Sequence, residues 1–302
     1  MRIAVTGRNG QVVQSLLERA SGSDIEITTI ARPDVDLARP DSIEAALLAL
    51  RPDAVVSAAA YTAVDLAETE IEQAHAVNGA GAGAIAKAAG VLGIPVVHLS
   101  TDYVFDGSLD RPYSEEDPTG PVGVYGQSKL AGERAIAAAT DNHAILRTAW
   151  VYSPFGKNFA RTMLMLASKR DEISVVSDQR GTPTNALDIA DGVLAAARNL
   201  AAQPNAKHLR GVFHMTGGGE ANWAEFAEAI FAASQAIGGP AARVIPIPSS
   251  AYPTPAKRPA NSRLDNSKLA RAHNIRLPDW RQSLPPTVAR LVALDFQGND
   301  RK

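Results

Sequence analysis

Short apolar runs alternate with helix-like segments over the first 150 residues. The apolar runs predict strands, and they span Arg2–Val5, Glu26–Ile30, Ala54–Ala58, Pro95–Ser100 and Ala144–Arg147. Helical spacing or Ala-rich composition between them predicts helices over Gln11–Ala20, Asp41–Leu50, Glu72–Leu92 and Gln127–Thr140. Strands that alternate with helices form βαβ units. We therefore predict an α/β fold around a doubly wound parallel sheet.

This alternation loosens after about Trp150. Segments 153–183 and 217–260 are richer in Gly, Pro, Ser and other polar residues. Helical patterns persist at Ala186–Ala202 and Trp223–Ala236, and Val212–Met215 predicts one more strand. The pattern indicates a smaller second region assembled from several segments of the chain.

Composition narrows the range of partners. The chain has 302 residues, a net charge of −2 and no cysteine. The charge argues against a nucleic-acid partner, because neutralising a phosphate backbone needs a basic surface. The absence of cysteine excludes disulfides and thiolate metal sites. The N-terminus does not resemble a signal peptide, and no apolar stretch approaches the length of a membrane span. We expect a cytoplasmic protein without a membrane partner.

A glycine turn follows the first predicted strand and opens the first helix. Its central residues are Gly7, Asn9 and Gly10. In doubly wound sheets, the pyrophosphate of a dinucleotide rests on a helix N-terminus at this position. The spacing of Gly7 and Gly10 follows the pattern G-x-x-G-x-x-G, although Val13 stands at the third glycine. The turn predicts a dinucleotide site on a Rossmann-type fold.

The glycine turn assigns roles to the two regions. We expect residues 1–150 to form a dinucleotide-binding domain, completed by return segments near 184–215 and 240–250. The smaller C-terminal substrate-binding region is expected to comprise residues 151–183, 216–239 and 251–302.

The end of the second strand bears on the choice of cofactor. An acidic residue at this point favours NAD, whereas an arginine can hold the extra phosphate of NADP. The strand here ends in Ile30-Ala31-Arg32. Arg32 favours NADPH, with NADH as the alternative. The same residue could equally be a solvated surface arginine that does not contact the cofactor.

Tyr125 and Lys129 stand four residues apart on a predicted helix. This spacing places them on one helix face. Reduction of a carbonyl needs a proton donor, and an ammonium group beside a phenol lowers the phenol's high pKa. The preceding strand ends in Ser100 and Thr101, and strand ends in such sheets face the ligand crevice. A hydroxyl there can hydrogen-bond the same carbonyl. The set predicts a site for carbonyl reduction.

Several longer motifs give the chain a family resemblance. They are Ala58–Asp65, Ser100–Gly107, Tyr125–Lys129, Arg147–Tyr152, Asp178–Thr184, Arg258-Pro259 and Ser262–Asp265. In these motifs the chain resembles, over essentially its whole length, the dTDP-4-dehydrorhamnose reductases, which are extended short-chain dehydrogenases. The resemblance implies hydride transfer to C4 of a dTDP-4-keto-6-deoxy-L-mannose, which yields dTDP-L-rhamnose.

The resemblance also implies residue roles. Tyr125 would protonate the C4 oxygen, Lys129 would tune Tyr125 and bind the nicotinamide ribose, and Thr101 would hydrogen-bond the keto oxygen. The other implied contacts to the cofactor are from Gly10, Gln11, Val12, Asp36, Leu37, Ala59, Ala60, Tyr61, Thr62 and Ser100. The implied contacts to the nucleotide-sugar are from Thr62, Val64, Asp102, Tyr103, Val104 and Trp150. Arg180 is a candidate partner for the substrate's diphosphate, as are Arg258 and Arg263.

Metal binding and assembly are less clearly indicated. Some family members bind Mg²⁺ at a dimer contact through carboxylates, one of them in the first helix. That helix here contains Gln14-Ser15-Leu16, so we assign no metal ligands and leave Mg²⁺ binding open, and a homodimer is possible. The six histidines lack the spacing of ligands and are expected to be ordinary core or surface residues.

Two alternatives stay open from the sequence. The Tyr/Lys pair also serves related nucleotide-sugar epimerases and reductases of other keto-sugars. A non-catalytic NADP-binding regulatory subunit could use the same scaffold, although the presence of Thr101, Tyr125 and Lys129 argues against it.

Overall fold

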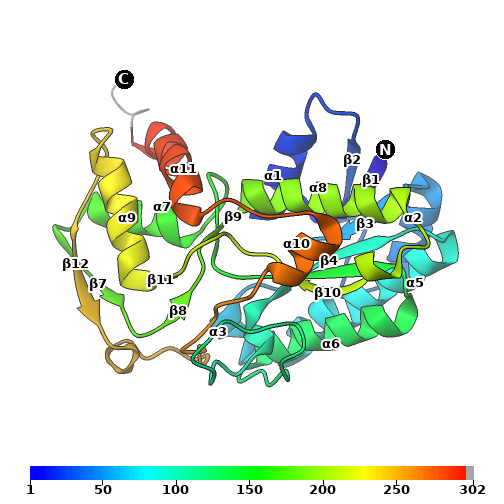
Figure 1. Cartoon of the computed structure of the whole chain (residues 1–302), viewed down its shortest axis with the longest axis horizontal. Helices are drawn as coiled ribbons and strands as arrows, with labels where there is room; N and C mark the ends of the chain where they lie inside the picture. The colour runs from blue at the N-terminus through cyan, green and yellow to red at the C-terminus, as the bar shows by residue number, and fades with distance from the viewer. Residues whose placement is uncertain (297–302) are drawn as a thin grey trace.

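A six-stranded parallel sheet forms the centre of the computed structural model, which describes residues 1–296 (Figure 1). The strand order is β10-β5-β4-β3-β1-β2, and every neighbouring pair is parallel. The six strands are β1 (Arg2–Thr6), β2 (Glu26–Ile30), β3 (Ala54–Ser57), β4 (Val96–Thr101), β5 (His143–Thr148) and β10 (Gly211–His214). All six were predicted from apolar runs, so the α/β fold with a parallel sheet is confirmed.

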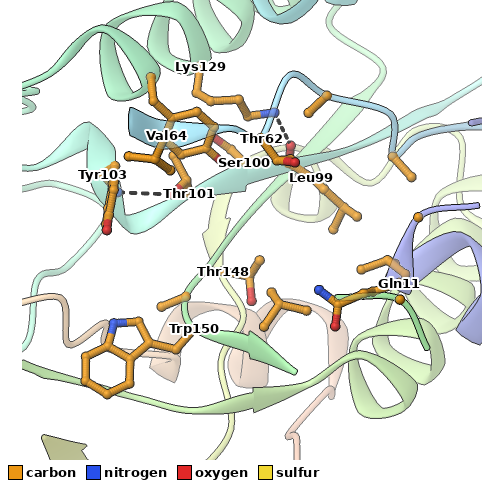
Figure 2. Close-up of a pocket in the computed structure, with 18 of the residues that line it drawn as sticks. Gln11, Thr62, Val64, Leu99, Ser100, Thr101, Tyr103, Lys129, Thr148 and Trp150 are labelled. Carbon is orange, nitrogen blue, oxygen red and sulfur yellow. Dashed lines mark hydrogen bonds between the residues drawn. The ribbon is translucent and has the colours of Figure 1, made fainter. Parts of the chain in front are cut away.

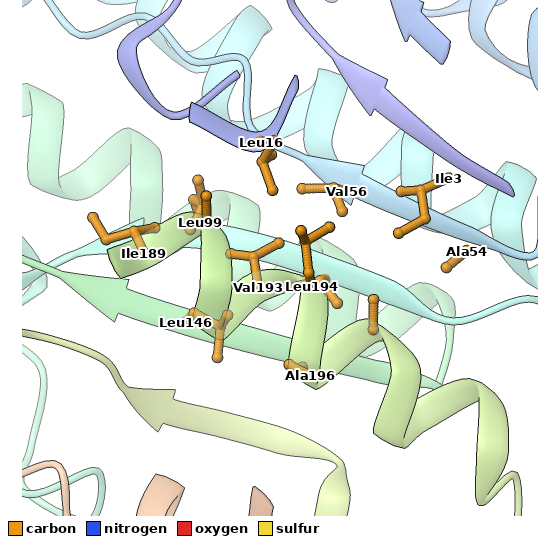
Figure 3. Close-up of a cluster of buried hydrophobic side chains, with 14 of the residues drawn as sticks. Ile3, Leu16, Ala54, Val56, Leu99, Leu146, Ile189, Val193, Leu194 and Ala196 are labelled. Atoms are coloured by element: carbon orange, nitrogen blue, oxygen red, sulfur yellow. The ribbon is translucent and has the colours of Figure 1, made fainter. Parts of the chain in front are cut away.

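Helices cover both faces of this sheet (Figure 1). One face carries α1 (Gln11–Ala20) and α8 (Ala186–Ala202), and the other carries α2 (Asp41–Leu50), α5 (Ala82–Leu92) and α6 (Val124–Ala139). Side chains alternate along each strand. Figure 3 shows Val56, Leu99 and Leu146 facing α8. The strands are apolar along their length because both of their faces are buried.

The predicted helix Glu72–Leu92 contains a change of helical type. It consists of α4 (Ile71–His75), a π-helical segment η1 (Ala76–Gly81) and α5. The buried side chain of Asn78 in η1 accepts a hydrogen bond from the Tyr61 amide at 2.8 Å and donates to the Tyr61 carbonyl at 3.0 Å and to Ser128 Oγ at 3.0 Å. The π turn thereby ties the loop after β3 to α6.

A second hydrophobic core lies beside the sheet, at the left of Figure 1. It is enclosed by α7 (Phe159–Ala167), α9 (Trp223–Gln235), α11 (Trp280–Asp295) and the parallel pair of β7 (Glu172–Val176) with β12 (Arg243–Ile247). The buried side chains at its centre include Leu164, Phe226, Ile230, Trp280 and Leu291.

The packing differs from the expected division of the chain in two places. Residues 240–250 were expected to return to the first region, and this is wrong: β12 pairs with β7 and turns Val244 toward the second core. Conversely, α10 (Ser267–His273) packs on the sheet side through Leu269, although it falls within the expected segment 251–302. Residues 297–302 of that segment lie outside the described part of the chain.

Short elements complete the connections. They are α3 (Val64–Ala67), η2 (Asp102–Val104), β6 (Val151–Tyr152), β8 (Arg180–Gly181), β9 (Thr184–Asn185), η3 (Lys207–Leu209), β11 (Ala221–Asn222) and η4 (Ser249–Ala251). Within residues 1–296, no helix combines the length and apolar character needed to cross a membrane.

Candidate active site

A cavity of about 660 Å³ opens at the carboxyl ends of β1, β3, β4 and β5. The direction of strand order reverses between β1 and β3, and ligands of open α/β sheets bind at such a switch point. Most of the predicted site residues line this cavity: Gly7, Asn9, Gly10, Gln11, Val12, Ala59, Ala60, Thr62, Val64, Ser100, Thr101, Asp102, Tyr103, Tyr125, Lys129 and Trp150. Figure 2 shows Thr101, Tyr103 and Lys129 facing Trp150 across the space.

The glycine turn meets the cavity with uncapped backbone amides. Helix α1 begins after Gly10, has no side-chain cap on its first turn and carries no acidic residue there. Gly7 has a φ of 98°, and a Cβ atom at this position would lie 3.3 Å from the Ala59 side chain. A glycine therefore lets β1 turn tightly beside the loop after β3. Free amides at a helix N-terminus are a site for a phosphate group.

Two buried polar side chains hold the loop after β3 in place. The Thr6 hydroxyl at the end of β1 accepts hydrogen bonds from the amides of Ala58 and Ala59, each at 3.0 Å. Asn78 holds both backbone groups of Tyr61, as described above. Ala59, Ala60 and Thr62 consequently line the cavity as a fixed backbone segment.

The end of β4 brings hydroxyl and carboxyl groups into the cavity. The Thr101 hydroxyl donates to Asp102 Oδ1 at 3.0 Å and accepts from the Tyr103 amide at 3.2 Å. The other carboxyl oxygen of Asp102 is buried. Burial raises the pKa of Asp102 to about 6, against the opposing effect of hydrogen bonds from the side chains of Ser262 and Thr101.

Tyr125 and Lys129 line the cavity from the first turns of α6, but their side chains do not pair in the predicted way. The ammonium group of Lys129 donates to the Leu99 carbonyl at 2.6 Å (Figure 2) and lies 3.3 Å from His98 Nε2. Burial raises the pKa of Tyr125 to about 12, and the carboxylate of Asp102 acts in the same direction. Burial also lowers the pKa of Lys129 to about 8. The expectation that Lys129 lowers the pKa of Tyr125 is wrong for this arrangement, because the ammonium is turned toward β4.

An ion pair is buried directly behind these residues. Arg147 on β5 donates to both oxygens of Glu133 on α6, at 2.9 and 2.7 Å, and both side chains are about 5% exposed or less. The Ser100 hydroxyl donates to the same carboxylate at 2.5 Å. Ser100 is thus held from behind, and we call the cavity side formed by Ser100, Thr101, Tyr125 and Lys129 the sheet wall.

The opposite side of the cavity is aromatic. Trp150 and Trp223 stack with ring centroids 3.5 Å apart, and Phe159 lies 4.7 Å from Trp223. We call these three residues the aromatic wall. Trp150 has a φ of 48°, and a Cβ atom on Gly181 would come within 2.4 Å of its indole ring. Gly181 therefore lets β8 pass directly against the tryptophan.

Eight predicted or candidate site residues do not line the cavity. They are Arg32, Asp36, Leu37, Tyr61, Val104, Arg180, Arg258 and Arg263. Leu37 and Val104 are buried in hydrophobic clusters, where an apolar side chain is most stable. The Tyr61 hydroxyl donates to Glu70 at 2.8 Å, and Asp36 accepts from the Ala38 amide at 3.0 Å.

The candidate arginines differ in their surroundings. Arg32 is exposed just after β2. Arg180 and Arg263 both pair with Glu220, at 2.6 and 2.8 Å, and Arg258 pairs with Asp65 at 2.8 Å. In this structure these last three arginines pair with carboxylates and do not line the cavity.

Other cavity residues escaped the sequence reasoning. Thr148 ends β5 directly beside Thr101 and has a buried hydroxyl without a partner among the described residues. Its place at a strand end was a usable signal. Lys157, Phe159 and Trp223 reach the cavity from the second region, and no local pattern marks them.

Comparisons with known proteins agree with this geometry. Residues 1–293 match a family described as RmlD substrate binding domain. A dTDP-4-dehydrorhamnose reductase from Sinorhizobium fredii is 52% identical over 99% of this chain and 100% of its own length. This chain belongs to the dTDP-4-dehydrorhamnose reductase family. A crystal structure of such a reductase from Clostridium acetobutylicum is similar with a TM-score of 0.89, at 34% identity over 96% of this chain and 99% of that one.

A second reductase structure, from Bacillus anthracis, was determined in complex with NADP. It has a TM-score of 0.87 and 31% identity, and the match covers 95% of this chain and 98% of that one.

Val13 stands where the pattern G-x-x-G-x-x-G has its third glycine. Its side chain is buried beneath the turn, and its Cγ2 atom would lie 3.4 Å from a Cβ atom on Gly7. Among residues 1–296, no three side chains of His, Asp or Glu gather as metal ligands.

Proposed function

We propose that the chain reduces the C4 keto group of dTDP-4-dehydro-L-rhamnose to dTDP-L-rhamnose, with NADPH as the hydride donor and Tyr125 as the general acid. The observation that carries the proposal is the convergence of Thr101, Tyr125 and Lys129 with the glycine turn in one cavity. Membership of the reductase family supplies the identity of the substrate.

The residues of the glycine turn fit a dinucleotide. The first turn of α1 offers amides to an anion, without a competing side-chain cap. Ala59, Ala60 and Thr62, in the loop after β3, line the cavity beside that turn. When bound, the reduced nicotinamide supplies the hydride for the reaction. The Bacillus anthracis reductase in complex with NADP and the exposed Arg32 both favour NADPH.

Tyr125 is suited to donate the proton. Its raised pKa keeps the phenol protonated at neutral pH. A carbonyl oxygen becomes strongly basic as the hydride reaches its carbon, and the phenol proton then moves to it. Thr101 and Thr148 offer hydroxyls to the same oxygen from neighbouring strand ends. Thr101 would have to turn its proton away from Asp102 to do so.

Lys129 is suited to hold the cofactor side of the site. With a pKa of about 8, it is largely charged at neutral pH. Two of its three N–H groups face Leu99 and His98, so the third is left for the cavity. A ribose hydroxyl of the cofactor is the acceptor that we assign to it.

The aromatic wall is suited to the nucleotide-sugar. Rings of Trp150 and Trp223 provide an apolar surface that matches a sugar ring or a base. Val64, Asp102 and Tyr103 also line the cavity and would complete the substrate contacts.

The experiment supplies dTDP-4-dehydro-L-rhamnose and NADPH and follows absorbance of the reduced cofactor. We expect substrate-dependent oxidation of NADPH and formation of dTDP-L-rhamnose, identified by mass and chromatography. Tyr125→Phe, which removes only the hydroxyl, is the matched control. Absence of substrate-dependent oxidation with the wild-type protein would refute the proposal.

The same assay separates the two alternatives. An epimerase would retain oxidised cofactor through purification and convert its substrate without net consumption of NADPH. A regulatory subunit would bind NADPH but would not oxidise it, whichever keto-sugar is supplied. The reductase must consume one NADPH for each sugar reduced.

A further inference from the structure

His98 lies on β4, fully buried beneath α6, and it contacts the Lys129 ammonium. Its Nε2 atom is 3.3 Å from Lys129 Nζ, and its Nδ1 atom is 2.9 Å from the Ser57 hydroxyl on β3. These three side chains, each 3% exposed or less, form a line from the cavity into the sheet. None of the cavity contacts described above explains why a histidine stands there.

The contacts define the state of the imidazole ring. An ammonium group has no lone pair, so Nε2 must accept from Lys129. Nδ1 then carries the ring proton and donates it to Ser57 Oγ, and Ser57 thereby selects this tautomer. Burial lowers the pKa of His98 well below its ordinary value, and the charges of Lys129 and His143 act in the same direction. The ring is therefore neutral over the working pH range.

We propose that His98 is a positioning residue for the reduction: its neutral imidazole, oriented by Ser57, accepts a hydrogen bond from the Lys129 ammonium and keeps that group charged and aimed at the cavity. The Leu99 carbonyl holds a second N–H of the same ammonium at 2.6 Å. With two directions fixed, the third N–H points along the one direction that remains. His98 itself does not line the cavity, so it acts through Lys129.

Other charged groups act on the same line of residues. Glu133 on α6 acts through Lys129, and His143 on β5 acts through His98. Tyr125 and Asp102 are the other titratable groups of the adjoining cavity lining, and Arg147 is the partner of Glu133. Glu133 raises the pKa of Lys129, against the lowering by burial, but it is itself paired with Arg147. Among residues 1–296, the acceptors that directly touch the ammonium are the Leu99 carbonyl and His98.

The test measures the pKa of Lys129 in two ways. The first is the alkaline limb of the pH profile of kcat at saturating NADPH and keto-sugar. The second is an NMR titration of protein carrying ¹³C-labelled lysine, with Lys129→Arg to assign the signal. Since a charged lysine loses its proton as pH rises, a lower pKa moves the alkaline limb to lower pH. The proposal rests on the proposed function for the kinetic profile only, because the NMR titration needs no turnover.

His98→Leu removes the acceptor and leaves an apolar side chain. We expect the pKa of Lys129 to fall by about one unit, and the alkaline limb to move with it, because a buried charge loses a hydrogen-bond partner. His98→Gln can present an amide oxygen to Lys129 and a donor to Ser57, and it should keep the pKa within about 0.3 units of wild type. Circular dichroism and thermal unfolding check that each variant is folded.

Ser57→Ala tests the orientation of the ring with a smaller change. Without this acceptor the ring can adopt the tautomer that places a proton on Nε2, so we expect a downward shift smaller than that of His98→Leu. This variant decides the matter if His98→Leu does not fold. An unchanged pKa in folded His98→Leu would overturn the proposal. So would an equal shift in His98→Gln, or an unchanged pKa in Ser57→Ala where His98→Leu does not fold.

Discussion

The two walls of the cavity are constructed from different kinds of contact. The sheet wall rests on buried polar and charged groups, with Glu133 and Arg147 paired behind Ser100 and His98 behind Lys129. The aromatic wall rests on stacked rings, and the core behind it is composed of side chains such as Leu164 and Phe226.

This difference corresponds to two tasks. Proton transfer requires a donor and an acceptor within hydrogen-bond reach, so the chemical groups need fixed directions. Hydrogen bonds and ion pairs impose direction, and strand ends provide rigid attachment. A sugar or base instead needs a surface of suitable shape, which rings supply without directional bonds. Variants of the sheet wall should therefore change kcat or folding, and variants of the aromatic wall should change KM.

The largest effect is expected at Tyr125. Tyr125→Phe keeps the ring and removes the proton donor, so kcat should fall by about 10²- to 10⁴-fold. KM for the nucleotide-sugar should change little. Steady-state kinetics at saturating NADPH provides both values. Turnover close to wild type would place the general acid elsewhere.

The next effect concerns stability behind the sheet wall. Glu133→Gln removes one member of a buried ion pair and leaves the Arg147 charge without its partner, which should cost about 3–5 kcal/mol of the free energy of unfolding. Denaturant unfolding measures this cost. Glu172→Gln breaks the exposed pair with Arg243 and should cost less than about 1 kcal/mol. Equal costs for the two variants would contradict the distinction between buried and exposed pairs.

A smaller effect is expected at the aromatic wall. Trp223→Leu removes the stacking partner of Trp150, and stacked aromatic pairs contribute about 0.5–1.5 kcal/mol beyond burial. KM for the nucleotide-sugar should rise about 2- to 12-fold while kcat stays within about twofold. Trp223→Phe retains a ring and serves as the control. A loss confined to kcat would show that the two walls do not divide the tasks.

The smallest effect is expected at Arg32, outside both walls. Arg32→Ala should weaken NADPH binding by about 1 kcal/mol, since the side chain is exposed and the interaction is screened by solvent. NADH binding to the same variant is the matched control and should not change. Fluorescence titration of each reduced cofactor measures the two affinities. Equal weakening of both would remove Arg32 from recognition of the extra phosphate.

Much of the fold was predictable because its signals are local. The apolar runs Arg2–Val5 and Pro95–Ser100 mark strands buried on both faces, and the glycine turn follows the first of them. The strand order, the π turn at Asn78 and the pairing of β12 with β7 were not predictable in this way. They depend on contacts between segments far apart in the chain.

The candidate site shows the same limit. Sequence spacing placed Tyr125 and Lys129 on one helix face, and the structure agrees. The direction of the Lys129 ammonium was predicted incorrectly, because the Leu99 carbonyl and His98 lie on another element. Leu37 and Val104 were placed in the site by family resemblance, but tertiary packing buries both in apolar clusters.

The sequence by itself determined the alternation of strands and helices, the glycine turn and the Tyr/Lys pair, since each depends on backbone periods and short spacings. Tertiary structure alone decided which groups surround that pair. His98 reads as an ordinary core histidine in the sequence, and Trp223 carries no local signal. Each acquires its partner, Lys129 or Trp150, only when the sheet and the second core pack together, because such contacts follow from chain topology.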